Sequence, residues 1–62
     1  MFLVKYDQWF RTKMDDVDYY PFTRKFDLLC DAIEYANDVV NGKYRGYLEL
    51  KVKPEEISIS MA

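Results

Sequence analysis

Few side chains in this sequence are suited to covalent or acid–base catalysis. The chain has no histidine and one cysteine, so it offers neither a serine–histidine nor a cysteine–histidine pair. That cysteine, Cys30, falls in the first turn of a predicted helix, where the helix dipole favours a thiolate, but Asp27 and Asp31 beside it oppose that effect. We therefore expect Cys30 to be a half-buried small residue and the protein to have no catalytic residues.

Two acidic runs could act through their carboxylates. The run Asp15-Asp16-Val17-Asp18 offers oxygen ligands for a hard cation, but it lacks the glycine and the distal glutamate of a calcium loop. Glu55 and Glu56 could form an acid–base pair, but they follow a turn proline and no pocket is expected around them. The only two glycines do not form a phosphate-binding loop. We expect no metal site and no cofactor.

Charge is segregated along the chain. Residues 15–38 carry a net charge of −5 and the remaining residues a net charge of +3, which together give the overall −2. Such asymmetry bears on what a protein binds more than on how it folds.

The acidic segment contains a predicted helix over residues 27–41. Its apolar residues follow the 3.6-residue period, Asp27 is a good N-cap, and Asn41-Gly42 supplies the left-handed residue that ends a helix. Four acidic residues at spacings of 4, 3 and 4 form a stripe on its solvent face: Asp27, Asp31, Glu34 and Asp38. No lysine or arginine lies between residues 26 and 42. Like charges at i,i+4 destabilise a helix, but only by about 0.2–0.5 kcal/mol, so the stripe alone does not demonstrate a function.

The stripe has two interpretations. It is either a merely solvated helix face or an acidic surface directed at a basic partner. In the second case Asp15, Asp16 and Asp18 extend the acidic surface if their turn lies near the helix.

Four alternating segments predict strands around this helix. The first covers residues 2–12, the second 17–26, the third 44–53, and a short fourth covers 57–61. Pro21 places the second strand at an edge of the sheet, because proline cannot donate to a ladder. The order β-β-α-β-(β) predicts a single α+β domain over residues 1–62, with a mostly antiparallel sheet in the order 2-1-3-4 and the helix on one face.

The sheet face opposite the helix is predicted to gather aromatic and basic residues. Trp9 and Tyr47 are expected to be neighbours there, flanked by basic side chains that include Arg11 and Arg45. Such a face could stack nucleic-acid bases, or it could form a protein or homodimer interface. Alternatively, the C-terminal tail packs over Trp9 within the same chain.

The size and composition limit the setting. A 62-residue domain is marginal alone, and one cysteine excludes an internal disulfide, so aromatic packing or oligomerisation must add stability. The sequence has no signal peptide and no membrane-length apolar run, and a lone cysteine suits a reducing compartment, so we expect a cytoplasmic protein with no membrane partner.

These features favour a small acidic, non-enzymatic protein-binding module that occupies a basic, nucleic-acid-binding surface of a larger protein. Its size and charge are in keeping with the small inhibitors that phages make against host or defence proteins, some of which mimic nucleic acid. No residue motif indicates a named family. The alternatives are a nucleic-acid-binding domain that uses Trp9, Arg11, Arg45 and Tyr47, or a structural homodimer subunit.

Overall fold

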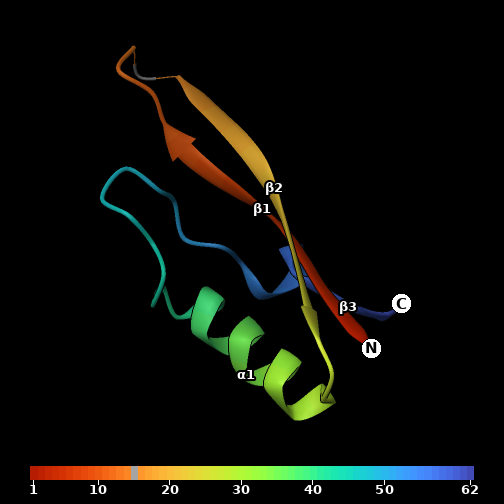
Figure 1. The fold of residues 1–62 in the computed structure, drawn as a ribbon. Coiled ribbons are helices and arrows are strands. Elements are labelled where there is room, and N and C mark those ends of the chain that lie inside the picture. Colours follow the sequence, from red (N-terminus) through yellow and green to blue (C-terminus); the bar gives the residue numbers. More distant parts are fainter. Residues whose placement is uncertain (15) are drawn as a thin grey trace.

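The computed structural model describes residues 1–14 and 16–62 and contains a three-stranded antiparallel sheet with one helix on one face (Figure 1). In chain order its elements are β1 (Phe2–Arg11), β2 (Val17–Phe26), α1 (Leu29–Val40), the 3₁₀ turn η1 (Pro54–Glu56) and β3 (Ser58–Met61). The predicted small α+β fold class is therefore confirmed, but the sheet has three strands in the order β2-β1-β3.

A long hairpin forms the frame of the molecule. Strands β1 and β2 pair antiparallel from Phe2↔Phe26 to Arg11↔Val17. Their alternating pattern leaves one face of β1 buried, as expected for a strand with one face on the core. β1 is central, and β2, with Pro21, lies at the edge. The hairpin tip projects away from α1, and the molecule is elongated, with extents of 40 × 19 × 16 Å (Figure 1).

Helix α1 ends where the sequence predicts but begins later. Gly42 adopts φ +82°, its N–H donates to Val39 O at 3.1 Å, and the N–H of Lys43 donates to Asp38 O at 2.9 Å. These two bonds form a Schellman C-cap around the glycine. The predicted N-cap is wrong, because the extended residue Leu28 precedes the first helical residue and no side chain caps the helix.

The predicted strand over residues 44–53 is wrong. Its only ladder contact is the isolated bridge Phe10↔Glu49, flanked by hydrogen bonds from Arg11 N to Leu48 O (2.9 Å) and from Leu50 N to Trp9 O (2.8 Å). Earlier in the segment, the Glu49 carboxylate accepts a hydrogen bond from Gly46 N at 2.6 Å and closes a local turn instead of a strand.

Beyond Leu50 the strand is stopped by a proline. If the register set by Phe10↔Glu49 continued, Lys5 would face Pro54, which has no N–H to donate. Instead Lys5 faces Ser58, so the register shifts by four residues between Glu49 and Ser58. The chain between them, which contains the 3₁₀ turn, lies outside the ladder. The segment predicted as the outer fourth strand therefore pairs directly with β1 as β3.

The core between the sheet and α1 is small. Helix α1 contributes Ala32, Ala36 and Val39, the loop contributes Val52, and β1 contributes Val4, Tyr6 and Gln8. Gln8 is polar, although it lies on the face of β1 that the alternation of the strand predicts to be buried and apolar. Its Nε2 donates to Leu50 O (2.7 Å) and Trp9 O (3.0 Å), which satisfies the buried amide and fixes the loop against β1.

Candidate functional site

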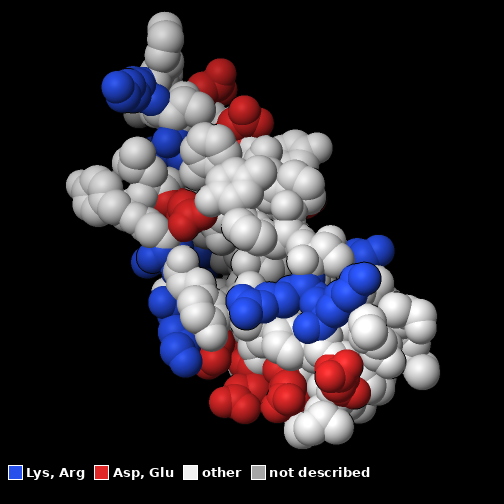
Figure 2. Space-filling view, viewed as in Figure 1, with Lys and Arg blue, Asp and Glu red and all other residues white. Residues whose placement is uncertain are grey.

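Acidic side chains gather over α1 and basic side chains lie beside them (Figure 2). Three of the four predicted stripe residues, Asp31, Glu34 and Asp38, line one hollow between α1 and β2. The fourth, Asp27, is exposed between β2 and α1 and does not line this hollow. The acidic stripe is therefore not a simple solvent face but one wall of a concave surface.

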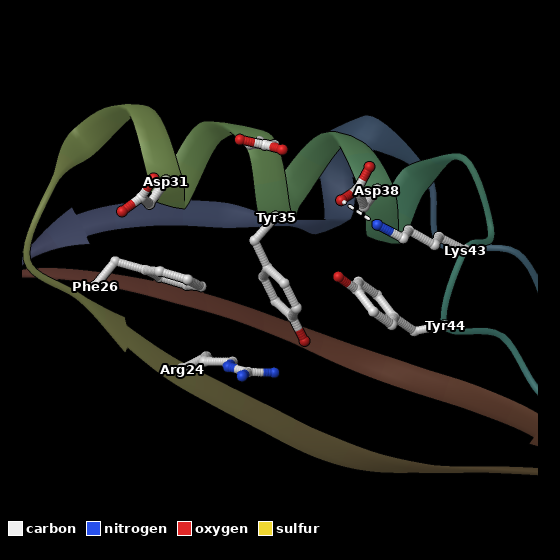
Figure 3. Close-up of a pocket in the computed structure, with 8 residues that line it drawn as sticks. Arg24, Phe26, Asp31, Tyr35, Asp38, Lys43 and Tyr44 are labelled. Atoms are coloured by element: carbon white, nitrogen blue, oxygen red, sulfur yellow. Dashed lines mark hydrogen bonds and ion pairs between the residues drawn. The ribbon is translucent and has the colours of Figure 1, made fainter.

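This hollow has a volume of about 280 Å³ and three kinds of lining. The carboxylates come from α1, three aromatic rings form the floor, and two basic side chains complete the rim (Figure 3). The aromatic residues are Phe26, Tyr35 and Tyr44, and the basic residues are Arg24 and Lys43. We call these eight residues the acidic hollow.

Tyr35 is the centre of the aromatic floor. It projects from α1 toward the sheet, and its ring centroid lies 5.3 Å from those of both Phe26 and Tyr44 (Figure 3). The hydroxyl oxygen of Tyr35 lies 3.3 Å from that of Tyr6 in the core, which ties the floor to β1. Burial, together with this hydrogen bond, raises the pKa of the Tyr6 phenol above its usual value. The aromatic floor is therefore held in place by the core.

Cations already contact this floor from within the chain. The Arg24 guanidinium carbon lies 5.1 Å from the Tyr35 ring centroid, within the range of a cation–π contact. Lys43 lies over Tyr44 at 5.6 Å and pairs with Asp38 at 3.4 Å. The charge of Asp38 raises the pKa of Lys43. Within residues 1–14 and 16–62, Lys43–Asp38 is the only ion pair, so Asp31 and Glu34 form none there.

The hairpin-turn acids do not join this site. Asp15 lies outside the described residues. Asp16 and Asp18 lie at the hairpin tip, where each carboxylate accepts a hydrogen bond from the following residue's N–H, at 3.2 and 2.8 Å. A ten-residue strand spans about 33 Å, whereas the twelve-residue helix spans about 18 Å, so α1 covers only about half of the hairpin. The acidic surface is therefore confined to the helix end of the molecule.

The predicted aromatic and basic face is assembled differently from expectation. Trp9 packs on Tyr19 of β2, with ring centroids 4.7 Å apart, and not on Tyr47, which is 100% exposed in the loop. Arg45 lies back toward Gly42 at the end of α1, where its backbone N–H donates to Gly42 O at 3.2 Å. Arg11 remains exposed at the end of β1.

These differences follow from the missing strand. Because residues 44–53 do not extend the sheet, Arg45 and Tyr47 have no strand position beside β1. The aromatic partner of Trp9 could have been found from the sequence, since Tyr19 is out of phase with Tyr20 and Phe22 and so belongs to the open face. The aromatic floor was also missed, although Tyr35 stands four residues after Asp31 and three before Asp38.

The remaining chemistry-bearing residues form no cluster. Among the residues described, no group of three or more histidine, cysteine, aspartate or glutamate side chains could hold a metal ion. Cys30 is exposed and not half-buried as predicted, because it lies on the side of α1 turned away from the sheet. No helix in the described part of the chain is long and apolar enough to cross a membrane.

The fold and the site together define a small α+β domain with an acidic hollow on one flank of its helix. Comparison with protein-family models, with curated proteins and with solved structures gives no match.

Proposed function

We propose that this protein is a non-enzymatic protein-binding module whose acidic hollow engages a basic surface on a larger protein. The observation that supports this is the convergence of Asp31 and Glu34, which form no ion pair among the described residues, with an aromatic floor in one hollow. Carboxylates beside aromatic faces suit an arginine or lysine side chain, which can form charged hydrogen bonds and a cation–π contact together.

The contacts of Arg24 indicate how a guanidinium group would bind. Arg24 lies over Tyr35, so the floor already accommodates a guanidinium on one side. A second guanidinium entering from the partner would find Asp31 and Glu34 on the helix side of the same hollow. A cation–π contact contributes about 0.5–1 kcal/mol when exposed and about 2 kcal/mol or more when desolvated. Several such contacts would be needed for tight binding, so we expect the hollow to anchor a wider interface.

The mode of action we propose is occupation. Where that basic surface binds nucleic acid through its phosphates, the module would compete with nucleic acid for it, as an inhibitor does, in the manner of the small acidic inhibitors that phages produce. Segregated charge would also steer the approach and make association dependent on salt concentration.

A labelled oligoarginine peptide tests the electrostatic part of this proposal. We expect the wild-type protein to bind the peptide and to lose affinity as salt rises, because the attraction is screened. The variant Asp31→Asn/Glu34→Gln removes two charges with little change of shape and should weaken binding about tenfold or more, equivalent to about 1.4 kcal/mol.

The chain offers a matched control. Glu55 and Glu56 are exposed in η1, outside the hollow, and Glu55→Gln/Glu56→Gln changes the net charge by the same amount. This control should bind almost as the wild type does. Equal losses in the two variants would show that only net charge matters and would remove the acidic hollow from the proposal. A separate experiment tests competition with nucleic acid: single-stranded DNA should release a cellular protein that the module has captured.

A second candidate is nucleic-acid binding by the open sheet face. The pair of Trp9 and Tyr19 supports it, since both rings are exposed on the face that also carries Lys5 and Lys25. Trp9 is the only tryptophan, so single-stranded oligonucleotide stacking on this face should quench the intrinsic fluorescence, with a steep salt dependence. Unchanged fluorescence at low salt would exclude this use of the face.

A further inference from the structure

We propose that the outer edge of β3 pairs with β3 of a second copy of this chain, giving a symmetric dimer with one continuous six-stranded sheet. β3 is an edge strand, and no other strand of the described chain covers its outer side. This inference is independent of the acidic hollow, which lies on the opposite flank of α1.

The backbone groups available for pairing can be assigned from the ladder. Ala62 N donates to Met1 O at 3.0 Å, and successive antiparallel pairs alternate between bonded and non-bonded positions. The N–H and C=O groups of Ser58 and Ser60 therefore face β1, and those of Ile59 and Met61 face outward. Two residues thus present unpaired donors and acceptors on the free edge.

This edge lacks the features that normally prevent strand pairing. Residues 57–62 contain no charged residue and no proline. The opposite edge strand, β2, has Pro21 in its middle and carries charged side chains at Asp18, Arg24 and Lys25. Proline and charge are the usual protection of an exposed edge against pairing with another chain. Of the two edge strands in the described sheet, only β3 is therefore open to a second strand.

An uncovered apolar corner lies beside this edge. Ile59 and Met61 share the face of β1 that bears Val4 and Phe2, under the helix side of the sheet, yet they are 37% and 77% exposed. At 100° per residue, Leu29 and Ile33 fall on the flank of α1 opposite Asp31 and Asp38, and are 46% and 45% exposed. Since the acidic flank faces β2, this apolar flank faces β3, and Figure 3 shows the C-terminal strand behind the helix when the hollow faces the viewer.

A two-fold axis through paired β3 edges brings these corners together. Antiparallel edge pairing in a continuous sheet puts both helices on the same face. Three strand spacings of about 4.8 Å separate the two β1 strands by about 14 Å. That gap is filled by Ile59 below and by the Leu29 and Ile33 side chains of both helices. The acidic flanks then face outward, so they do not repel each other across the interface.

A second copy is the occupant that these observations fit best. The edge is uncharged and offers both backbone donors and acceptors, and its corner is apolar, so both are complementary to themselves. The small core also needs support, because the largest fully buried side chain among the described residues is no larger than that of Val4. Domains of this size commonly gain the missing burial through a partner subunit. A standard interface takes about 800 Å² from each partner, roughly a sixth of the 4837 Å² surface here.

Sedimentation equilibrium over a concentration series tests the dimer. The wild-type mass should rise from 7.5 kDa toward twice that value as concentration increases. Met61→Pro removes an outward N–H and no bond to β1, so it should abolish dimerisation while circular dichroism shows the fold intact. Met61→Ala loses the side chain but keeps the edge N–H, and should dimerise more strongly than Met61→Pro.

A helix variant makes the test independent of the strand. Ile33→Lys places a charge in the apolar corner and should raise the dimer dissociation constant by about tenfold or more. Asn37→Lys adds the same charge at an exposed site further round α1 and should leave the dissociation constant within about twofold of wild type, since a single rim charge contributes little. A wild-type mass of 7.5 kDa at every concentration would overturn the proposal. So would a dimer that persists in both Met61→Pro and Ile33→Lys.

Discussion

Gln8 should be worth more to stability than any other polar side chain of this protein. The variant Gln8→Met keeps the length and volume of the side chain but removes both donated hydrogen bonds. Trp9 O still accepts from Leu50 N at 2.8 Å, so only Leu50 O loses a donor that nothing else supplies. One carbonyl left unsatisfied in a half-buried residue costs about 1–2 kcal/mol.

That loss is large for a domain of this size. A 62-residue chain has roughly 3–9 kcal/mol of folding free energy, and each kcal/mol shifts Tm by about 4–8 °C. Urea unfolding of Gln8→Met should therefore show a clear fall in midpoint. Amide exchange at Leu50, in the loop, and at Arg11, at the end of β1, should accelerate beyond the global change. These two N–H groups form the hydrogen bonds between the loop and β1, and Gln8 holds the loop there.

A control separates the hydrogen bonds from the change of residue type. Lys5→Met makes a polar-to-methionine change at an exposed position of the same strand and should alter the free energy of unfolding by less than about 0.5 kcal/mol. The reasoning would be refuted if Gln8→Met were as stable as wild type, or if exchange at Leu50 and Arg11 rose no more than exchange in the rest of the hairpin.

Three further predictions concern the core and the helix end. Burial raises the pKa of Tyr6 above its usual value of 10.0, so the contribution of this phenol to stability is complete below pH 10 and is lost as pH rises through the folded-state pKa. Tyr6→Phe should therefore reduce the fall of unfolding free energy with alkaline pH by up to about 1.4 kcal/mol per pH unit. Urea unfolding between pH 9 and 12 measures this slope. Gly42→Ala should cost about 1–2 kcal/mol in thermal unfolding, because φ is +82° and the added Cβ would meet nothing closer than Arg45 Nε at 3.8 Å, so the penalty is conformational. Val4→Ala should cost roughly 2 kcal/mol by the same measurement, because the side chain is fully buried and leaves a cavity.

The parts of the fold that sequence could predict are those fixed by neighbouring residues. The β1–β2 hairpin follows from alternation on either side of one turn, and the end of α1 follows from Asn41-Gly42. The pairing of residues 44–53 could not be predicted in this way. They alternate as a strand does, but the edge of β1 is shared, and Pro54 would fall opposite Lys5. Only the three-dimensional register shows that conflict.

The candidate site shows the same division. The acidic spacing on α1 was visible in the sequence, but the floor beneath it depends on three separate elements meeting: Phe26 from β2, Tyr35 from α1 and Tyr44 from the following turn. Conversely, Trp9 and Tyr47 were expected to meet only because the third strand was expected. Residues that meet through tertiary packing carry no local signal of it, so an error in strand assignment changes which side chains share a site.

The two flanks of α1 differ in their chemistry. Ala32, Ala36 and Val39 seat the helix on the sheet, and the residues on either side differ in kind: carboxylates toward β2 and aliphatic side chains toward β3. A helix selected only for packing has no reason to sort its flanks, because exposed charges on both would serve solubility equally well. The two interfaces that we propose would explain the sorting, since a dimer formed through the apolar flank would leave both acidic hollows on its outer sides. Such a dimer would present two identical anionic sites, and a partner with two matching basic sites would bind it with greater avidity than a monomer. Binding of such a partner should then weaken in Ile33→Lys, although that residue lies outside the hollow.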